Sequence, residues 1–218
     1  MKKVIFILAV NLTVHLGHAQ QVITQDPKAQ NILDAMSKKY KDMNSFKARI
    51  VMTLDNTKNG VKESSEGDIV VKGTKFHIKT DKQEIYNNGT TVWTYIKDAN
   101  EVNITTYEPE EDEVTPTKIY TIYKEGYKYR YVEDKVYNGV TYEVVELNPN
   151  DIKKNKFSKI KIEVNKKDRS IHTWKIFEKN GNVYSYSVKN FTSNIAVTDN
   201  YFNFDQSKYP GVIVNDLR

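Results

Sequence analysis

The chain has 218 residues, 33 Lys and Arg against 28 Asp and Glu, a formal net charge of +5 and no cysteine. This length suits one sizeable core, and we expect residues 20–218 to form a single domain. The charge, which falls to +3 if Lys2 and Lys3 leave with a leader, is too small to indicate nucleic-acid binding, and the lack of cysteine excludes disulfides and a lipid anchor on a thiol.

Residues 1–19 have the pattern of a secretory signal peptide. Lys2 and Lys3 precede an apolar run over 4–16, and Gly17-His18-Ala19 follows it. The run is too short for a permanent membrane anchor, and small residues at positions 17 and 19 match a cleavage site. We therefore expect cleavage after Ala19 and a soluble product in an extracytoplasmic space.

An amphipathic helix is predicted directly after the leader. Asp26-Pro27 is a capping residue followed by proline, and Ile32, Met36 and Tyr40 recur at a spacing of four. The pattern predicts a helix of about 17 residues. Such a stripe is typical of a helix packed on a core, although its methionines would also suit a deformable ligand.

The period changes to two from Phe46 onward, which is typical of strands with one apolar face. Gly73-Thr74 is predicted to be a bend or bulge, and Asn88-Gly89 to be a tight hairpin turn. Successive hairpins of this kind predict an antiparallel meander. The large apolar residues of this region are Ile50, Met52, Leu54, Ile69, Val71, Phe76, Ile78, Trp93 and Tyr95.

The middle of the chain breaks this rhythm. An acidic run at 108–113 is expected to be a solvated loop. Thr115-Pro116 then repeats the signal of a cap and a proline, ahead of an apolar stripe of Ile119, Ile122 and Tyr123. We predict a second, short helix over 116–124.

Strands resume after Gly126. Asn138-Gly139 and Asn180-Gly181 are hairpin signals, and the alternating apolar residues are Ile160, Ile162, Val164, Trp174 and Ile176. About ten strands, with turns every eight to twelve residues, predict a barrel or sandwich that two helices cap.

Residues that could carry chemistry are few. Only His77 and His172 remain beyond the leader, no metal site is expected, and no nucleophile elbow or phosphate loop is present. A hydrolase using acids such as Asp68 or Glu84 stays as a minor alternative. We expect a binding protein without a cofactor rather than an enzyme.

Four stretches in order resemble the LolA family of outer-membrane lipoprotein carriers: "GDIVVKGTKFHIK", "NNGTTVWTY", "IHTWKIFEKNG" and "YFNFDQSKYPGVIVNDLR". The likeness extends from about Ile32 to Arg218. The positions that match the family's motifs are Gly67, Asp68, Lys72, Phe76, Gly89, Trp93, Tyr95, Phe202, Phe204, Pro210, Gly211, Val212 and Asp216. The resemblance implies a mainly β fold with a helical lid (α+β), an unclosed antiparallel half-barrel of ten to eleven strands around a hydrophobic cavity, capped by the two helices.

The resemblance also implies a function. Family members carry the acyl chains of lipoproteins through the periplasm, from an inner-membrane ABC exporter to the outer membrane, so the resemblance implies that the extracytoplasmic space is the periplasm, and we expect a monomer. The alternative is a periplasmic module on the same fold that senses lipid or lipoprotein. The cavity residues expected are Ile50, Met52, Leu54, Ile69, Val71, Phe76, Ile78, Trp93, Tyr95, Ile160, Ile162, Val164, Trp174 and Ile176. The lid residues expected are Ile32, Met36, Tyr40, Ile119, Ile122 and Tyr123.

One departure from the family pattern concerns the lid. Well-studied members have Arg-Pro after the lysine that corresponds to Lys72, and that Arg bonds to the lid; here Gly73-Thr74 stands in its place. Glycine has no side-chain donor, so either another polar contact holds the lid or the lid is looser than in those members. The departure also leaves open which outer-membrane acceptor takes the cargo.

Overall fold

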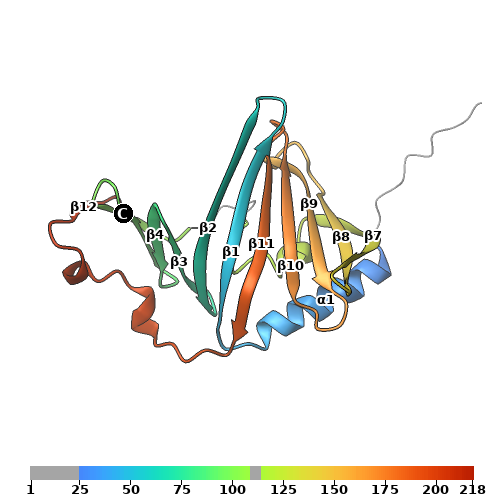
Figure 1. Cartoon of the computed structure of the whole chain (residues 1–218), viewed down its shortest axis with the longest axis horizontal. Coiled ribbons are helices and arrows are strands. Elements are labelled where there is room, and N and C mark those ends of the chain that lie inside the picture. The colour runs from blue at the N-terminus through green and yellow to red at the C-terminus, as the bar shows by residue number, and fades with distance from the viewer. Residues whose placement is uncertain (1–24, 109–113) are drawn as a thin grey trace, which may run out of the picture.

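The structure is a computed structural model that describes residues 25–108 and 114–218. The predicted leader and most of the acidic run lie outside these residues. The described part of the chain forms one sheet of 12 strands in the order β12-β6-β5-β4-β3-β2-β1-β11-β10-β9-β8-β7 (Figure 1). The strands are β1 (Phe46–Asn56), β2 (Val61–Lys72), β3 (Lys75–Thr80), β4 (Gln83–Asn87), β5 (Thr91–Ile96), β6 (Glu101–Thr106), β7 (Tyr127–Tyr137), β8 (Val140–Pro149), β9 (Phe157–Asn165), β10 (Ile171–Glu178), β11 (Val183–Ser193) and β12 (Ile213–Asp216).

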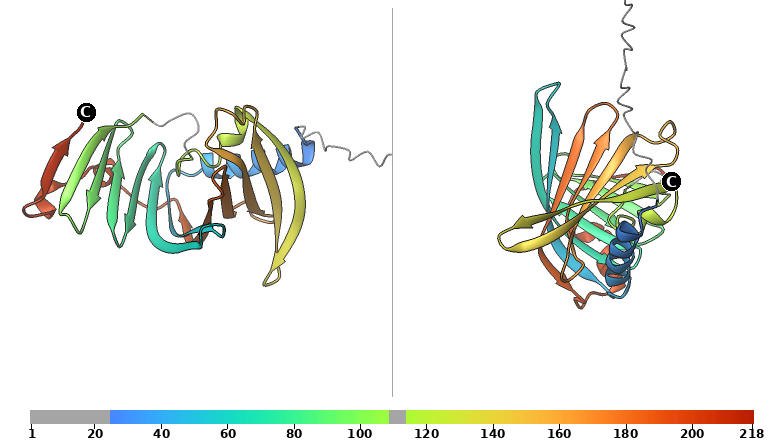
Figure 2. Two further views of the ribbon diagram at one scale, coloured as in Figure 1. Left: turned by 90° about the horizontal axis from the view of Figure 1, so that it is seen from above. Right: turned by 90° about the vertical axis from the view of Figure 1, so that its right-hand side faces the viewer.

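Two meanders make up this sheet. One runs from β1 to β6 and the other from β7 to β11, and the antiparallel pairing of β1 with β11 joins them. β7 and β12 are the two edges, so the sheet does not close. The predicted mainly β, unclosed antiparallel fold is thus confirmed, with a curved sheet (Figure 2). One pairing was not predicted: β12 adds to β6 in parallel.

The register divides the sheet into two faces, because directly paired residues point to the same side. Phe46 pairs with Val71, and Ala48 with Ile69. We call the side that carries Ala48 the inner face and the side that carries Arg49 the outer face. The inner face of β1 to β3 and of β7 to β11 holds most of the buried apolar cluster.

Helix α1 (Pro27–Lys41) lies against the half of the sheet that β7 to β11 form (Figure 1). Its N-cap Asp26 accepts hydrogen bonds from the backbone N–H groups of Lys28 and Tyr131, both at 2.8 Å. The first bond caps the helix, and the second ties its start to β7. The predicted helix and its cap are therefore present at the expected place.

The second predicted helix is not a continuous α-helix. Residues 116–121 form hydrogen-bonded turns, and only the 3-10 helix η1 (Ile122–Lys124) follows. The Thr115 carbonyl accepts from both Lys118 and Ile119, so bonds of the 3-10 and α types are mixed. A segment this short, rich in β-branched residues, gains too little from helix propagation to become regular.

The Gly73-Thr74 pair is the turn between β2 and β3 rather than a bulge within one strand. Gly73 has φ +59°, a left-handed conformation that glycine adopts without strain. The Asn88-Gly89, Asn138-Gly139 and Asn180-Gly181 turns lie where the sequence predicted them.

The C-terminal tail, residues 194–218, packs its rings on the outer face of β3 to β5 before it ends at the edge of the sheet: Tyr201 lies against His77, Phe204 against Tyr86, and Tyr209 against Tyr95. It contains the 3-10 helices η2 (Asp199–Phe202) and η3 (Gln206–Lys208) before β12. Phe202 is fully buried, as is Val102 of β6. The molecule therefore has apolar packing on both faces of the sheet: under α1 on the inner face, and under the tail on the outer face.

Candidate functional site

Twelve of the fourteen predicted cavity residues lie on the inner face. The fully or nearly buried ones are Ile69, Val71, Phe76, Ile160, Ile162 and Val164, and the half-buried ones are Ile50, Met52, Leu54, Ile78, Trp174 and Ile176. The register brings strands that are distant in sequence together, since Trp174 pairs with Ile162 on one side and with Tyr186 on the other. The inner face is therefore a continuous apolar surface across both meanders.

Trp93 and Tyr95 lie on the opposite side, and their prediction as cavity residues does not fit this placement. Tyr95 pairs with Glu84, which pairs with Lys79 of β3, on the outer face. The ring of Tyr95 packs on Tyr209 of the tail at 4.4 Å between centroids. Because the tail supplies a second apolar layer, strands β4 to β6 have large side chains on the outer face too.

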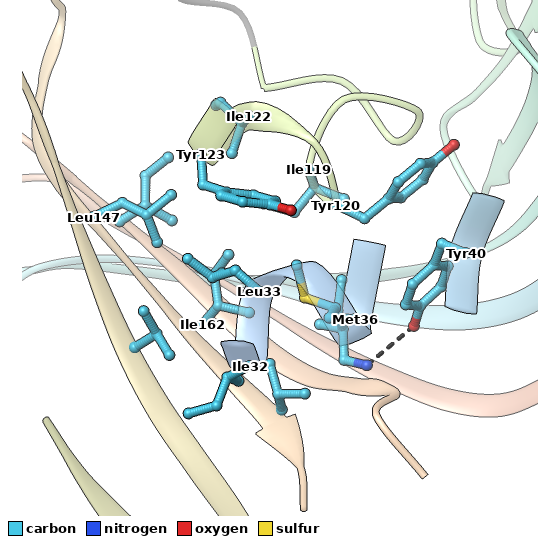
Figure 3. Packing of buried hydrophobic residues seen from close by; sticks show 14 of the residues in the cluster. Ile32, Leu33, Met36, Tyr40, Ile119, Tyr120, Ile122, Tyr123, Leu147 and Ile162 are labelled. Atoms are coloured by element: carbon cyan, nitrogen blue, oxygen red, sulfur yellow. Dashed lines mark hydrogen bonds between the residues drawn. The ribbon is translucent and has the colours of Figure 1, made fainter. Parts of the chain in front are cut away.

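A lid of two pieces covers part of the inner face: α1 and residues 115–124, which we call the lid segment. All six predicted lid residues are buried, and Figure 3 shows the side chains of α1 and of the lid segment directed toward one another. The rings of Tyr40 and Tyr120 stack at 5.2 Å between centroids. The sequence-predicted residues of both pieces are thus brought together over one surface.

The space beneath this lid is almost filled. A cavity of only about 30 Å³ remains, with an almost wholly apolar lining. Its lining residues are Tyr40, Phe46, Ala48, Ile50, Ile69, Pro116, Ile119, Tyr120, Ile171, Trp174, Val188 and Phe191. That volume holds a water molecule or two but no acyl chain. The structure is a closed state in which the protein's own side chains occupy the inner face.

Two buried tyrosine hydroxyls make polar contacts in the lid, in addition to those of Asp26 with β7 and of Lys39 with Asp168. Tyr40 accepts a hydrogen bond from the backbone N–H of Ile171 in β10 at 3.0 Å, and Tyr123 donates to Asp34 of α1. Burial raises the pKa of Tyr40 to about 12, and burial together with the Asp34 contact raises the pKa of Tyr123, so both stay protonated. These contacts hold the lid although the family's arginine is absent at Gly73.

The inner face continues beyond the lid as an open groove of about 600 Å³ near the tip of the β1–β2 hairpin. Its apolar floor consists of Met52, Leu54 and Tyr184. Polar residues rim it, namely Glu63, Ser64, Ser65, Glu66, Thr80, Asp81, Lys82 and Gln83. Apolar surface is therefore accessible from solvent even while the lid is closed.

Sequence reasoning missed several inner-face residues. They are Val145 and Leu147 of β8 and Tyr184, Tyr186 and Val188 of β11. The signal was present, because "VYSYSV" alternates apolar and polar side chains in the same way as the strands that were identified.

A buried carboxylate, Glu84, organises the outer face under the tail. It lies 3.1 Å from the Lys79 ammonium and accepts hydrogen bonds from the hydroxyls of Tyr86 and Tyr209 at 2.8 and 3.2 Å. Burial alone would raise the pKa of Glu84, but these partners outweigh it and lower the pKa to about 2. The cluster ties the tail to the sheet. Among the described residues, no group of acids and histidines is placed to hold a metal ion.

This cluster predicts a specific acid sensitivity. A carboxylate whose pKa is lowered by folding stabilises the protein above its unfolded pKa, near 4.5, and loses that contribution as the pH falls toward 2. The free energy of unfolding should therefore drop over this range, and the drop should be smaller in Glu84→Gln than in the unchanged protein. Urea unfolding at several pH values measures both slopes. Equal slopes would contradict the assigned role of Glu84.

Comparisons with known proteins find one family model and several solved structures to which this chain is similar. The model of the family described as "Outer membrane lipoprotein carrier protein LolA" matches residues 41–205. A solved structure of an uncharacterized conserved protein from Thermus thermophilus has a TM-score of 0.58 at 12% identity, covering 87% of this chain and 99% of that one. A LolA superfamily protein from Nitrosomonas europaea has a TM-score of 0.45 at 13% identity, with 81% and 98% covered. The lipoprotein LppX from Mycobacterium tuberculosis has a TM-score of 0.47 at 10% identity, with 79% and 98% covered.

A search of curated protein sequences gives no match. Of the described helices, none has the length and apolar character needed to cross a bilayer.

Proposed function

Because the chain belongs to the LolA family of outer-membrane lipoprotein carriers, we propose that it is a periplasmic chaperone for lipoproteins. In this proposal the acyl chains bind to the inner face, and the protein carries them from an inner-membrane ABC exporter to the outer membrane. Residues 20–218 act as one domain and as a monomer, without a cofactor, once a leader ending at Ala19 has been removed.

One observation carries the proposal: the sheet does not close into a barrel around its apolar inner face, and a lid made of separate segments covers that face instead. An unclosed sheet cannot bury its own apolar face, so separate chain segments must cover it, and such a cover can give way to another apolar partner. Here α1 and the lid segment come from distant parts of the chain and leave a cavity of about 30 Å³. A bound acyl chain would replace the lid residues as the apolar partner of the sheet, so binding is an exchange of one apolar contact for another.

The energetics of acyl chains agree with such an exchange. Each methylene removed from water contributes about 0.8 kcal/mol, so a free lipoprotein anchor cannot persist in water. A carrier that recovers its own apolar contacts on release lowers the cost of giving the cargo up. The open groove over Met52, Leu54 and Tyr184 offers a first site for an acyl chain before the lid moves.

The test is to isolate the protein from the periplasm of its host and to record native mass spectra. We expect acylated protein or lipid in a fixed ratio, released under denaturing conditions, and transfer of a purified triacylated lipoprotein from the carrier to acceptor vesicles. Failure to bind a monomeric acylated probe would refute the proposal. Stable binding without any transfer, together with a tight protein partner, would replace it by the sensory alternative.

A further inference from the structure

The tip of the β7–β8 hairpin, residues 136–140, exposes three apolar side chains. Val136 is 65% exposed, Tyr137 43% and Val140 37%. Between them, Asn138 and Gly139 have φ +49° and +77°, the geometry of a tight two-residue turn that suits the twist of the strands. The turn is too short for these side chains to fold back onto the sheet, and the hairpin projects from the body of the protein (Figure 2).

The three side chains point to both sides of the hairpin. Tyr137 pairs directly with Val140, so these two share one face, while Val136 pairs with Thr141 on the other. The Tyr137 ring also lies 5.7 Å from the Tyr142 ring and 5.9 Å from the His172 ring, which extends the apolar surface of that face toward the sheet. The hairpin tip is therefore apolar on both sides.

This arrangement selects the kind of partner. A folded protein that docks on one side of the hairpin leaves the other side in water, and a specific protein interface needs about 800 Å² from each partner, more than a five-residue tip supplies. A fluid apolar medium can surround both sides at once. Tyrosine beside aliphatic residues is the composition found where proteins meet the bilayer interface.

We propose that the hairpin tip inserts into the surface of a lipid bilayer and holds the protein there transiently. The charges next to the tip limit how deep it goes: Lys135 pairs with Glu163 at 3.0 Å, and Lys166 with Asp134 at 2.9 Å. The turn that carries Lys166 lies beside β8, because the backbone N–H of Lys166 donates a hydrogen bond to the carbonyl of Thr141 in β8. Since these pairs are neutral overall, insertion depends on apolar burial and little on anionic lipid or salt.

The cysteine-free chain permits a direct test. The Tyr137→Cys variant places an environment-sensitive NBD label at the hairpin tip. The control variant, Ile152→Cys, places the same label in another loop, at a position where the native side chain is 53% exposed. With phosphatidylcholine vesicles we expect a blue shift and quenching by doxyl lipids for the label at 137 but not for the label at 152. No change at 137, or equal changes at both positions, would overturn the proposal.

A second measurement leaves the tip unlabelled. Replacing Val136, Tyr137 and Val140 together by serine should lower the partition coefficient onto phosphatidylcholine vesicles about tenfold or more, equally at low and high salt. The matched control replaces Ile152, Ile213 and Leu217, which are also exposed, by serine and should change little. An equal loss in both variants, or a loss only at low salt, would contradict insertion of the tip.

The proposal stands apart from the carrier function. Partition of the protein onto vesicles measures insertion of the hairpin tip. Binding of a monomeric acylated probe, used below the concentration at which it aggregates, measures binding at the inner face. If the protein binds the probe but does not bind vesicles, the proposed carrier function stands and insertion of the hairpin tip is refuted. If it binds vesicles but not the probe, insertion of the tip stands and the carrier function is refuted.

Discussion

An aspartate in place of Ile176 is expected to reduce the affinity for a monomeric acylated probe about a hundredfold while the protein stays folded. Ile176 lies on the inner face of β10, paired with Tyr184 of the open groove, and is only half-buried. In the empty protein the new carboxylate keeps contact with water. An acyl chain laid over it would remove that water without offering a hydrogen bond, which costs several kcal/mol, and each 1.4 kcal/mol is tenfold in affinity.

The measurement is a fluorescence titration with the acylated probe, accompanied by urea unfolding. Lys175→Asp is the matched control, because Lys175 is the residue next to Ile176 in β10 and is exposed on the outer face. That variant should bind as the unchanged protein does. If Ile176→Asp binds normally, or if both variants lose affinity alike, the inner face at β10 does not receive the cargo.

A phenylalanine in place of Tyr40 is expected to strengthen binding of the same probe, by up to about tenfold, while it weakens the fold. The hydroxyl of Tyr40 joins α1 to the Ile171 N–H of β10, and its loss leaves a buried donor unpaired at a cost of about 1–3 kcal/mol. Because the lid must leave before cargo can occupy the covered surface, a less stable closed state lowers the cost of binding. Affinity and the free energy of unfolding should therefore change in opposite directions.

Tyr120→Phe is the control for this prediction. Its ring stacks on Tyr40 and lines the same cavity, but among the described residues it makes no hydrogen bond to the sheet. The substitution removes the same atom and makes the cavity equally more apolar. If Tyr120→Phe raises the affinity as much as Tyr40→Phe does, the polarity of the cavity lining governs binding, and the hydrogen bond between Tyr40 and β10 does not. A loss of affinity for Tyr40→Phe would mean that the lid also holds the cargo.

The elements that the sequence could predict are those decided by neighbours in the chain. Asp26-Pro27 and the spacing of Ile32, Met36 and Tyr40 predict α1 because a cap and an apolar stripe act within a few turns. The Asn-Gly pairs predict the hairpins because left-handed backbone angles belong to single residues. Alternation alone also identified twelve of the inner-face residues, since apolar side chains recur at every second position over most of β1 and β9, in part of β10, and where β2 and β3 meet.

Other features depended on contacts between distant segments. Alternation separates the two faces of a strand but does not say which face meets the lid, so Trp93 and Tyr95 could be assigned only once the tail was seen to cover the outer face. The lid segment remained irregular because packing against α1, rather than helix propensity, holds it in place. The parallel pairing of β12 with β6 and the cluster around Glu84 join residues more than a hundred positions apart. Local sequence therefore determined which strands and turns form, and tertiary packing decided which apolar side chains become core, lid or open groove.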